Sequence, residues 1–223
     1  MDFPQFWRRF GGSSRRKHLK GYDSVYGSAQ PEDPMANKRR FILPDRSELP
    51  IDFIRMEPWE IEYLFMLAAL ATQGAVEIGR FNGGSVFVMS CANEEIPIFS
   101  IDVEPKDDAL LESYFAQCDV GQNVTLVVGD SQQIQSPEIG AFDLCYIDGD
   151  HSYSGCTKDL ENWFPALTSG GHLLLHDSYL GSAVQKSVID FIHTHDVEVV
   201  LSPYQGRSHW LTDHGSLAHL IKR

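Results

Sequence analysis

The sequence contains no long hydrophobic segment that would place it in a membrane. No apolar run approaches the roughly 18 residues that a membrane-spanning helix needs. Residues 1–10 (MDFPQFWRRF) lack the apolar core and the small-residue cleavage site of a secretory signal peptide. We therefore expect a cytoplasmic protein without membrane contact.

Cysteine is scarce and widely spaced. No two cysteines form a C-x-x-C pair, and two of them, Cys91 and Cys145, lie in apolar runs. This pattern favours reduced structural thiols in a cytosolic protein. The four cysteines are Cys91, Cys118, Cys145 and Cys156.

Basic residues are few relative to acidic ones, and they are unevenly distributed. The chain has 18 Lys and Arg against 31 Asp and Glu, which gives a formal net charge of −13. Residues 1–46 carry a net charge of +5, whereas residues 47–223 carry −18. An acidic body does not suit a phosphate backbone, so we expect no nucleic acid partner.

The two parts of the chain also differ in organisation. Residues 1–50 show no sustained hydrophobic period, and we expect an irregular basic N-terminal extension there. Residues 51–223 are expected to fold as one domain. The extension could pack on the acidic body of its own subunit or of a neighbouring one. In the second case the protein would be a homo-oligomer.

The sequence lacks the usual nucleotide-binding glycine patterns. It has neither the G-x-G-x-x-G fingerprint nor a P-loop, which disfavours an NAD-linked oxidoreductase. What it has is VEIGRFNGGS (residues 76–85), a short apolar strand that ends in an acid and is followed by a glycine turn and a helix start. Because Glu77 disfavours a phosphate in the same turn, the pattern suits a cationic, amino-acid-like ligand with a nucleoside, such as S-adenosylmethionine.

Strands and helices alternate after residue 57. This order predicts a single Rossmann-like, doubly wound α/β domain with a mostly parallel seven-stranded sheet, an antiparallel last strand and helices on both faces. Expected strands are 75–78, 96–101, 124–128, 142–147, 172–175, 197–201 and 207–211. Expected helices are 58–73, 84–92, 105–117, 155–167, where Gly170 and Gly171 would stop the helix, and 182–194.

Each of the first five expected strands ends in or beside an acidic residue. The carboxyl ends of parallel strands share one edge of the sheet, where ligands bind. Each acid alone could be a turn or cap residue, but five along one edge indicate a site. They are Glu77, Asp102, Asp130, Asp148 and Asp177.

The densest of these clusters are YIDGDHSY and GGHLLLHDS, which end neighbouring strands. Asp148, His176 and Asp177 together offer oxygen and nitrogen ligands for a divalent cation, although imidazole is a poor ligand for Mg²⁺. Asp150 and His151 lie on the loop between the two strands and could remove a proton from a substrate hydroxyl. The alternative is an ordinary turn with a capping Asp and a strand-end His.

With these motifs in place, the chain resembles the class I S-adenosylmethionine-dependent methyltransferases. VEIGRFNGGSV is similar to their first motif, FSIDVEP to their second, and VVGDSQQI to their adenine-side loop. Residues 142–178 more closely resemble the subgroup of macrocin, mycinamicin and noviose sugar O-methyltransferases and cephalosporin-hydroxylase-like proteins. They are more distantly similar to catechol O-methyltransferase. The resemblance covers about residues 57–215.

The resemblance implies a role for each matched residue. It places the methionine part of the cofactor at Glu77, Gly79 and Gly83, the ribose at Asp102, and the adenine between Asp130 and Ser131. We add Arg80 and Ser85 of the same glycine turn to the cofactor set. Asp148 and Asp177 match two metal-ligating acids, and Asp150 and His151 match the positions of a general base. His176 stands where those enzymes carry a third acid.

The expected function is O-methylation of a small hydroxylated molecule, such as a sugar of a natural product or glycan, by S-adenosylmethionine with Mg²⁺ or Mn²⁺. Two alternatives stay open. One is a metal-free methyltransferase with another small-molecule acceptor. The other is a non-catalytic scaffold that retains the cofactor fold, which the intact set of acids disfavours.

Overall fold

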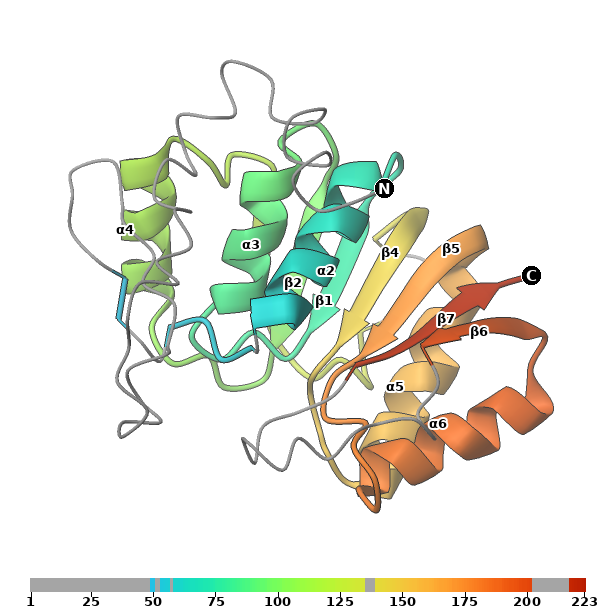
Figure 1. Ribbon diagram of the computed structural model, residues 1–223. Coiled ribbons are helices and arrows are strands. Elements are labelled where there is room, and N and C mark those ends of the chain that lie inside the picture. The colour runs from blue at the N-terminus through green and yellow to red at the C-terminus, as the bar shows by residue number, and fades with distance from the viewer. Residues whose placement is uncertain (1–48, 51–52, 57, 135–138, 202–216) are drawn as a thin grey trace, which may run out of the picture.

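The computed structural model describes residues 49–50, 53–56, 58–134, 139–201 and 217–223 (Figure 1). None of the described helices is both long and apolar enough to cross a membrane. The elements, in chain order, are α2 (Pro58–Leu70), β1 (Ala75–Ile78), α3 (Gly84–Ala92), β2 (Ile98–Asp102), α4 (Asp108–Cys118), β3 (Val124–Val128), β4 (Phe142–Ile147), α5 (Tyr153–Trp163), the 3₁₀ turn η3 (Phe164–Ala166), β5 (Leu167–Leu175), α6 (Ala183–Thr194), β6 (Val197–Leu201) and β7 (Ala218–Lys222).

The seven strands form one sheet in the order β3-β2-β1-β4-β5-β7-β6. Neighbouring strands are parallel except at β7, which is antiparallel to both β5 and β6. The predicted fold class is therefore confirmed. The strand order reverses between β1 and β4, and such a switch point is where open α/β sheets bind ligands.

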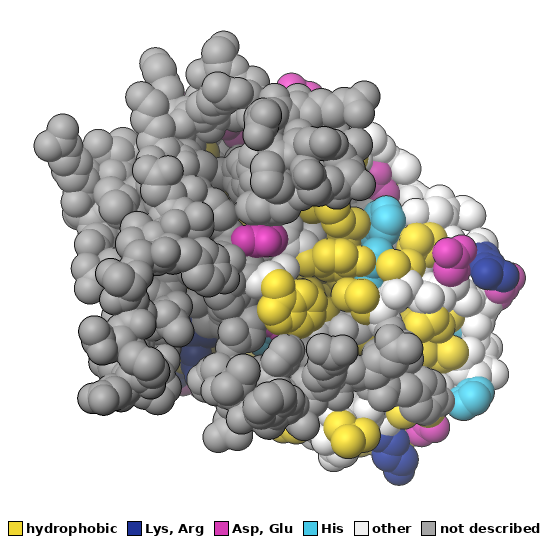
Figure 2. All heavy atoms as spheres, viewed as in Figure 1, with side chains coloured by type: hydrophobic (Ala, Val, Ile, Leu, Met, Phe, Trp, Pro, Cys, Tyr) yellow, Lys and Arg dark blue, Asp and Glu magenta, His cyan; other side chains and the backbone are white. Residues whose placement is uncertain are grey.

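Side chains that alternate along the strands enter two separate cores, one on each face of the sheet. Leu144 and Leu174 pack with α2, α3 and α4, whereas Cys145 and Leu173 pack with α5 and α6. In Figure 1, α2 and α3 lie side by side on one face. Figure 2, seen from the same direction, shows histidine side chains among hydrophobic ones on the visible surface. All four cysteines are buried and free, as expected.

Four strands have the predicted bounds, and the differences elsewhere have physical causes. β2 begins at Ile98 because the preceding Pro97 has no N–H to pair. α4 begins at Asp108, after Asp107 has accepted a hydrogen bond from the N–H of Leu110. Both elements were expected to begin earlier.

The prediction for α5 and β5 was wrong in its boundary. Gly170 and Gly171 do not stop the helix. Instead α5 ends at Trp163, a 3₁₀ turn that contains Pro165 follows, and β5 runs through both glycines. The strand expected at 207–211 lies outside the described residues, and the last described strand is β7. The expected extension of residues 1–50 also lies almost wholly outside them.

Backbone hydrogen bonds continue the sheet beyond the strand ends and align the residues that follow. The N–H of Gly79 donates to Ile101 at 2.9 Å, and the N–H of Asp148 donates to Ile78 at 2.7 Å. The N–H of His176 donates to Ile147 at 3.0 Å. The ends of β1, β4 and β5 therefore meet at one edge of the sheet.

Candidate functional site

The turn between β1 and α3 packs directly against the end of β4. Gly79 has a φ of +91°, and a Cβ atom placed on it would lie 2.0 Å from the carbonyl oxygen of Asp148. Both the backbone conformation and the space therefore require glycine. Gly83 precedes α3 and provides no side-chain cap for its first N–H groups. Those groups can serve a ligand at this edge.

The acid at the end of β1 supports the turn from within the core. Glu77 is fully buried, and its two carboxylate oxygens accept hydrogen bonds from the hydroxyls of Ser85 and Ser100. Burial raises the pKa of Glu77 to about 7, although both hydroxyls and Arg80 act in the opposite direction. The predicted cofactor residues Glu77 and Ser85 thus bind each other, which joins β1 to α3.

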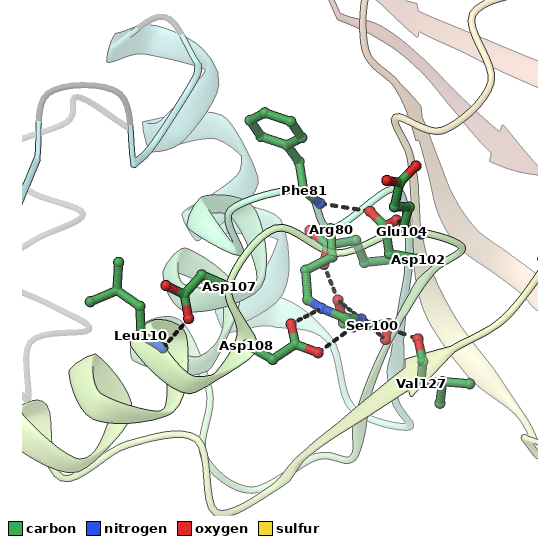
Figure 3. A network of polar contacts seen from close by, with 10 residues as sticks. Arg80, Phe81, Ser100, Asp102, Glu104, Asp107, Asp108, Leu110 and Val127 are labelled. Carbon is green, nitrogen blue, oxygen red and sulfur yellow. Dashed lines mark hydrogen bonds and ion pairs between the residues drawn. The ribbon is translucent and has the colours of Figure 1, made fainter.

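Arg80 connects the same turn to α4, β2 and β3 through hydrogen bonds (Figure 3). Its Nε and Nη2 atoms donate to the two carboxylate oxygens of Asp108 at 2.8 and 2.9 Å. Nη1 donates to the carbonyl oxygens of Ser100 and Val127. Arg80 was predicted to contact the cofactor, and the structure places its guanidinium inside this protein network.

Asp102 sits at the end of β2 and shapes the turn from the other side. Its carboxylate accepts hydrogen bonds from the backbone N–H groups of Phe81 and Glu104, each at 2.7 Å (Figure 3). An ionised carboxylate has about four acceptor positions, so two remain for ligand hydroxyls. The side chain is partly exposed. This arrangement suits a pair of ribose hydroxyls.

Exposed apolar side chains flank Asp102, and the sequence analysis did not single them out. Val103 and Val128 are 72% and 65% exposed where β2 and β3 end. Phe81 is 38% exposed with a φ of 49°, and the side chains of Arg55 and Lys106 lie within 5.4 Å of its ring centre. Such an apolar border can pack against a flat base. In the sequence, the feature that could have indicated this border is Phe81, a bulky residue inside a glycine turn.

The loop after β3 is held by α5. The hydroxyl of Ser131 donates to Asp159 at 2.6 Å, and its carbonyl oxygen accepts from Asn162 and Trp163. Asp130 accepts from the N–H of Gln132 within its own turn. Asp130 and Ser131, the predicted adenine-side residues, therefore lie at the same edge of the sheet as Asp102, with the Ser131 hydroxyl turned toward α5.

A compact group of possible metal ligands lies where β4 and β5 end. One ligand atom from each of Asp148, His151 and Asp177 lies within 4.8 Å of the others. Nε2 of His151 is 3.1 Å from Oδ1 of Asp148 and 3.4 Å from Oδ2 of Asp177. Sequence reasoning assigned His151 to proton removal only, whereas the structure brings it into the ligand group.

His176 adjoins this group from inside the fold. Its imidazole is buried, and Nδ1 lies 3.3 Å from Oδ1 of Asp148 and 3.6 Å from Oδ2 of Asp177. Nδ1 makes no aligned hydrogen bond with either carboxylate. A buried nitrogen aimed at two carboxylates, with its hydrogen bond unmade, fits a site for a divalent cation. The donor set of two acids and two imidazoles fits as well.

The charges in this group depend on one another. Burial alone would raise the pKa of Asp148, but His176 and His151 outweigh it and lower that pKa to about 2. Burial would lower the pKa of His176, but Asp148 and the other surrounding acids raise it well above its usual value. Asp148 is therefore ionised at neutral pH and ready to bind a cation.

Asp177 and Asp150, which follow β5 and β4, have different surroundings. Asp177 has a φ of 56°, an uncommon conformation that is frequent at functional sites. Asp150 accepts from the N–H of Ser152 at 2.8 Å, and its carboxylate lies over Gly155 at the start of α5. Of the two candidate bases, His151 therefore lies beside Asp148 and Asp177, whereas Asp150 stabilises the loop before α5.

The part of the chain that contains these residues matches a known family. Residues 76–178, which run from β1 to just beyond Asp177, match the family described as a methyltransferase domain. No curated protein sequence shows a significant match to this chain.

Solved structures share the fold at low sequence identity. SAH-bound PaMTH1, a methyltransferase from Podospora anserina, has a TM-score of 0.61 and 16% identity, with 100% of this chain and 98% of that chain covered. A protein from Staphylococcus aureus described as a caffeoyl-CoA O-methyltransferase gives 0.58 and 15%, over 75% and 85%. An rRNA-methylase-like protein from Clostridium thermocellum gives 0.56 and 16%, over 74% and 96%.

Proposed function

We propose that this chain, whose residues 76–178 match a methyltransferase domain and which shares its fold with an SAH-bound methyltransferase, is a class I S-adenosylmethionine-dependent methyltransferase. It methylates a hydroxyl group of a small molecule with the help of a divalent cation. The observation that carries the proposal is the ligand group at the ends of β4 and β5. Asp148, His151 and Asp177 lie beside the glycine turn, since the carbonyl of Asp148 is in contact with Gly79. Cofactor and cation would therefore be neighbours.

The chain's own residues divide the work of the reaction. The turn from Gly79 to Gly83 and the first N–H groups of α3 bind the amino-acid part of the cofactor, and Asp102 binds its ribose. Asp148, Asp177 and His176 would hold the cation, which would supply Lewis-acid chemistry to the acceptor hydroxyl. His151, the more exposed member of the group, would accept the proton from that hydroxyl and not bind the cation. Because the cofactor and the acceptor would both bind at this edge of the sheet, the site would favour in-line transfer of the methyl group.

The acceptor class follows from the chemistry of the ligand group. A cation held by few side chains has positions left for two neighbouring hydroxyls, as in a sugar or another diol. Exposed Tyr179 and Leu180, which are 42% and 65% exposed just after Asp177, add an apolar border. The S. aureus neighbour described as an O-methyltransferase supports a hydroxyl group as the methyl acceptor. The negative charge of residues 47–223 disfavours RNA as the substrate.

A binding and activity experiment tests the proposal. Calorimetry should show S-adenosylhomocysteine binding, and methyl transfer to a panel of diols should require Mg²⁺ or Mn²⁺. Because imidazole favours transition ions, Mn²⁺ should bind more tightly than Mg²⁺. The D148N and D177N variants should lose metal-dependent activity and keep cofactor affinity. Full activity after dialysis against EDTA would instead favour the metal-free methyltransferase.

A further inference from the structure

A fully buried carboxylate from α2 lies behind the candidate metal site. Glu60 is in the first turn of α2 and is 0% exposed. Its Oε2 atom lies 3.1 Å from Nε2 of His176. An acid near a helix N-terminus is favourable on a surface, but burying an ionised group is costly unless it is paired. The contact with His176 gives one oxygen of this buried carboxylate a partner inside the fold.

The imidazole of His176 connects this carboxylate with the ligand group. Nε2 faces Glu60, while Nδ1 faces Asp148 and Asp177 from the opposite side of the ring. An ionised carboxylate can only accept a hydrogen bond, so the ring must keep its proton on Nε2. Nδ1 would then be the ring nitrogen that faces a cation held by Asp148 and Asp177.

We infer that Glu60 is a positioning residue that fixes His176 as a nitrogen ligand of the cation site. This inference rests on the proposed function, because it requires a cation at Asp148 and Asp177. Carboxylates that hold the second nitrogen of a ligand histidine typically change metal affinity 10- to 100-fold. Because Glu60 acts through an imidazole, its effect falls on Mn²⁺ more than on Mg²⁺.

The same helix provides a matched control. Tyr63, one turn after Glu60, binds His219 of β7 through its hydroxyl at 2.6 Å from Nδ1. Nε2 of His219 then lies 2.9 Å from Nδ1 of His172. The Y63F variant removes a bond between α2 and a sheet histidine without touching the ligand group. It therefore shows how much metal affinity changes when only the attachment of α2 to the sheet is weakened.

The experiment measures Mn²⁺ and Mg²⁺ affinities of the purified protein by calorimetry, without turnover. The E60A variant should bind Mn²⁺ about 10- to 100-fold more weakly, bind Mg²⁺ with little change, and keep its affinity for S-adenosylhomocysteine. E60Q, whose amide oxygen can still accept from Nε2, should recover most of the Mn²⁺ affinity. Y63F should keep both metal affinities.

A double-mutant cycle tests whether Glu60 acts through His176. In an H176A background, replacing Glu60 with Ala should change Mn²⁺ affinity little further. Wild-type Mn²⁺ affinity in E60A, or an equal loss for Mn²⁺ and Mg²⁺, would overturn the role of Glu60 and leave the proposed function intact. A wild-type protein that binds S-adenosylhomocysteine but no divalent cation would overturn both.

Discussion

Glu77 and Asp102 are acids at adjacent strand ends, yet their surroundings give them different roles. Both oxygens of Glu77 are used by the hydroxyls of Ser85 and Ser100, and the side chain is fully buried. Asp102 is partly exposed, and its two bonds come from backbone N–H groups of the adjoining loops. Glu77 therefore stabilises the turn, whereas Asp102 can both shape it and bind a ligand.

Replacing Asp102 with Ala should weaken S-adenosylhomocysteine binding by about 1.5–3 kcal/mol, the range for hydrogen bonds to a charged group. The measurement is calorimetric titration of the purified variant. The matched control is E104A, which removes the adjacent exposed acid and keeps the backbone N–H that Asp102 accepts. Equal affinities of D102A and E104A would contradict the ribose role of Asp102.

His151 and Asp150 are adjacent in sequence and differ in what they face. His151 contacts Asp148 and Asp177, whereas Asp150 accepts a hydrogen bond from Ser152 at the start of α5. The hydrogen bond with Asp148 raises the pKa of His151 despite partial burial. The geometry therefore favours His151 over Asp150 as the base.

Replacing His151 with Ala should lower kcat by roughly 10²- to 10⁴-fold, as expected for loss of a general base. Steady-state kinetics at saturating Mn²⁺ measures this effect separately from any loss of metal affinity. The D150N variant, which retains an oxygen for the Ser152 N–H, should stay close to wild type. If D150N loses the activity and H151A keeps it, Asp150 and not His151 is the general base.

Among the elements, α5 is the one that fixes the loop after β3. Three of its residues, Asp159, Asn162 and Trp163, hold Ser131 through the side chain and the carbonyl oxygen. Asp159 is buried, and its Oδ2 atom has no hydrogen-bond partner among the described residues. Burial raises the pKa of Asp159 to about 6, although the bond from Ser131 opposes this.

The raised pKa of Asp159 predicts a pH dependence of stability. A carboxyl whose pKa is higher in the folded state stabilises the fold fully below its unfolded value near 3.8, and this contribution is lost as the pH rises through about 6. The loss is on the order of 3 kcal/mol, at 1.36 kcal/mol per pKa unit. In D159N the side chain stays neutral, so this loss should be absent.

Urea unfolding of the wild type and D159N at pH 4.5 and pH 8 measures the difference. The variant should gain stability relative to the wild type as the pH rises. Asp143 provides a control, because hydrogen bonds from Thr72, Gln73 and Gly74 outweigh burial and lower its pKa. Its contribution to stability is lost only in more acidic solution, so D143N should differ from the wild type by nearly the same amount at both pH values. A constant difference between D159N and wild type at both pH values would refute the prediction.

Element boundaries were predictable where local chemistry sets them. The apolar runs that form β1, β3, β4 and β6 are bounded by turn residues, and their predicted limits match the structure. The extent of β5 was not predictable in this way. Its pairing with β4 shifts in register between Phe142 and Leu144, which lets the strand run through Gly170 and Gly171.

At the scale of the whole molecule, the net charge bears on whether this protein could bind RNA. The chain carries a net charge of −13, and residues 47–223 carry −18. Repulsion from phosphates should therefore outweigh the basic residues of 1–46. The cytoplasmic location and the homo-oligomer stay predictions.

The protein of residues 1–223 should not bind structured RNA at about 0.15 M salt, since nucleic acid affinity depends on releasing counterions with basic side chains. Fluorescence anisotropy with a labelled RNA measures this directly. Binding of S-adenosylhomocysteine by the same preparation shows that the protein is active. Tight RNA binding that persists in salt would turn the search for an acceptor away from small molecules.

The sequence by itself determined the alternation of strands and helices, the glycine turn and the line of acids at one edge, because local patterns encode each of them. It also placed Asp148 and Asp177 together, since parallel strands end on the same side. Only the tertiary structure decided that His151 joins them and that Asp150 does not. Such choices depend on loop geometry, which no local pattern specifies.

The position of Glu60 was likewise decided by tertiary structure. In the sequence it is one acid in the first turn of a helix, 116 positions from His176. Packing of α2 against the sheet buries it and brings it to that imidazole. Contacts between residues so distant in sequence depend on how helices pack, and the residue pattern along α2 alone cannot indicate them.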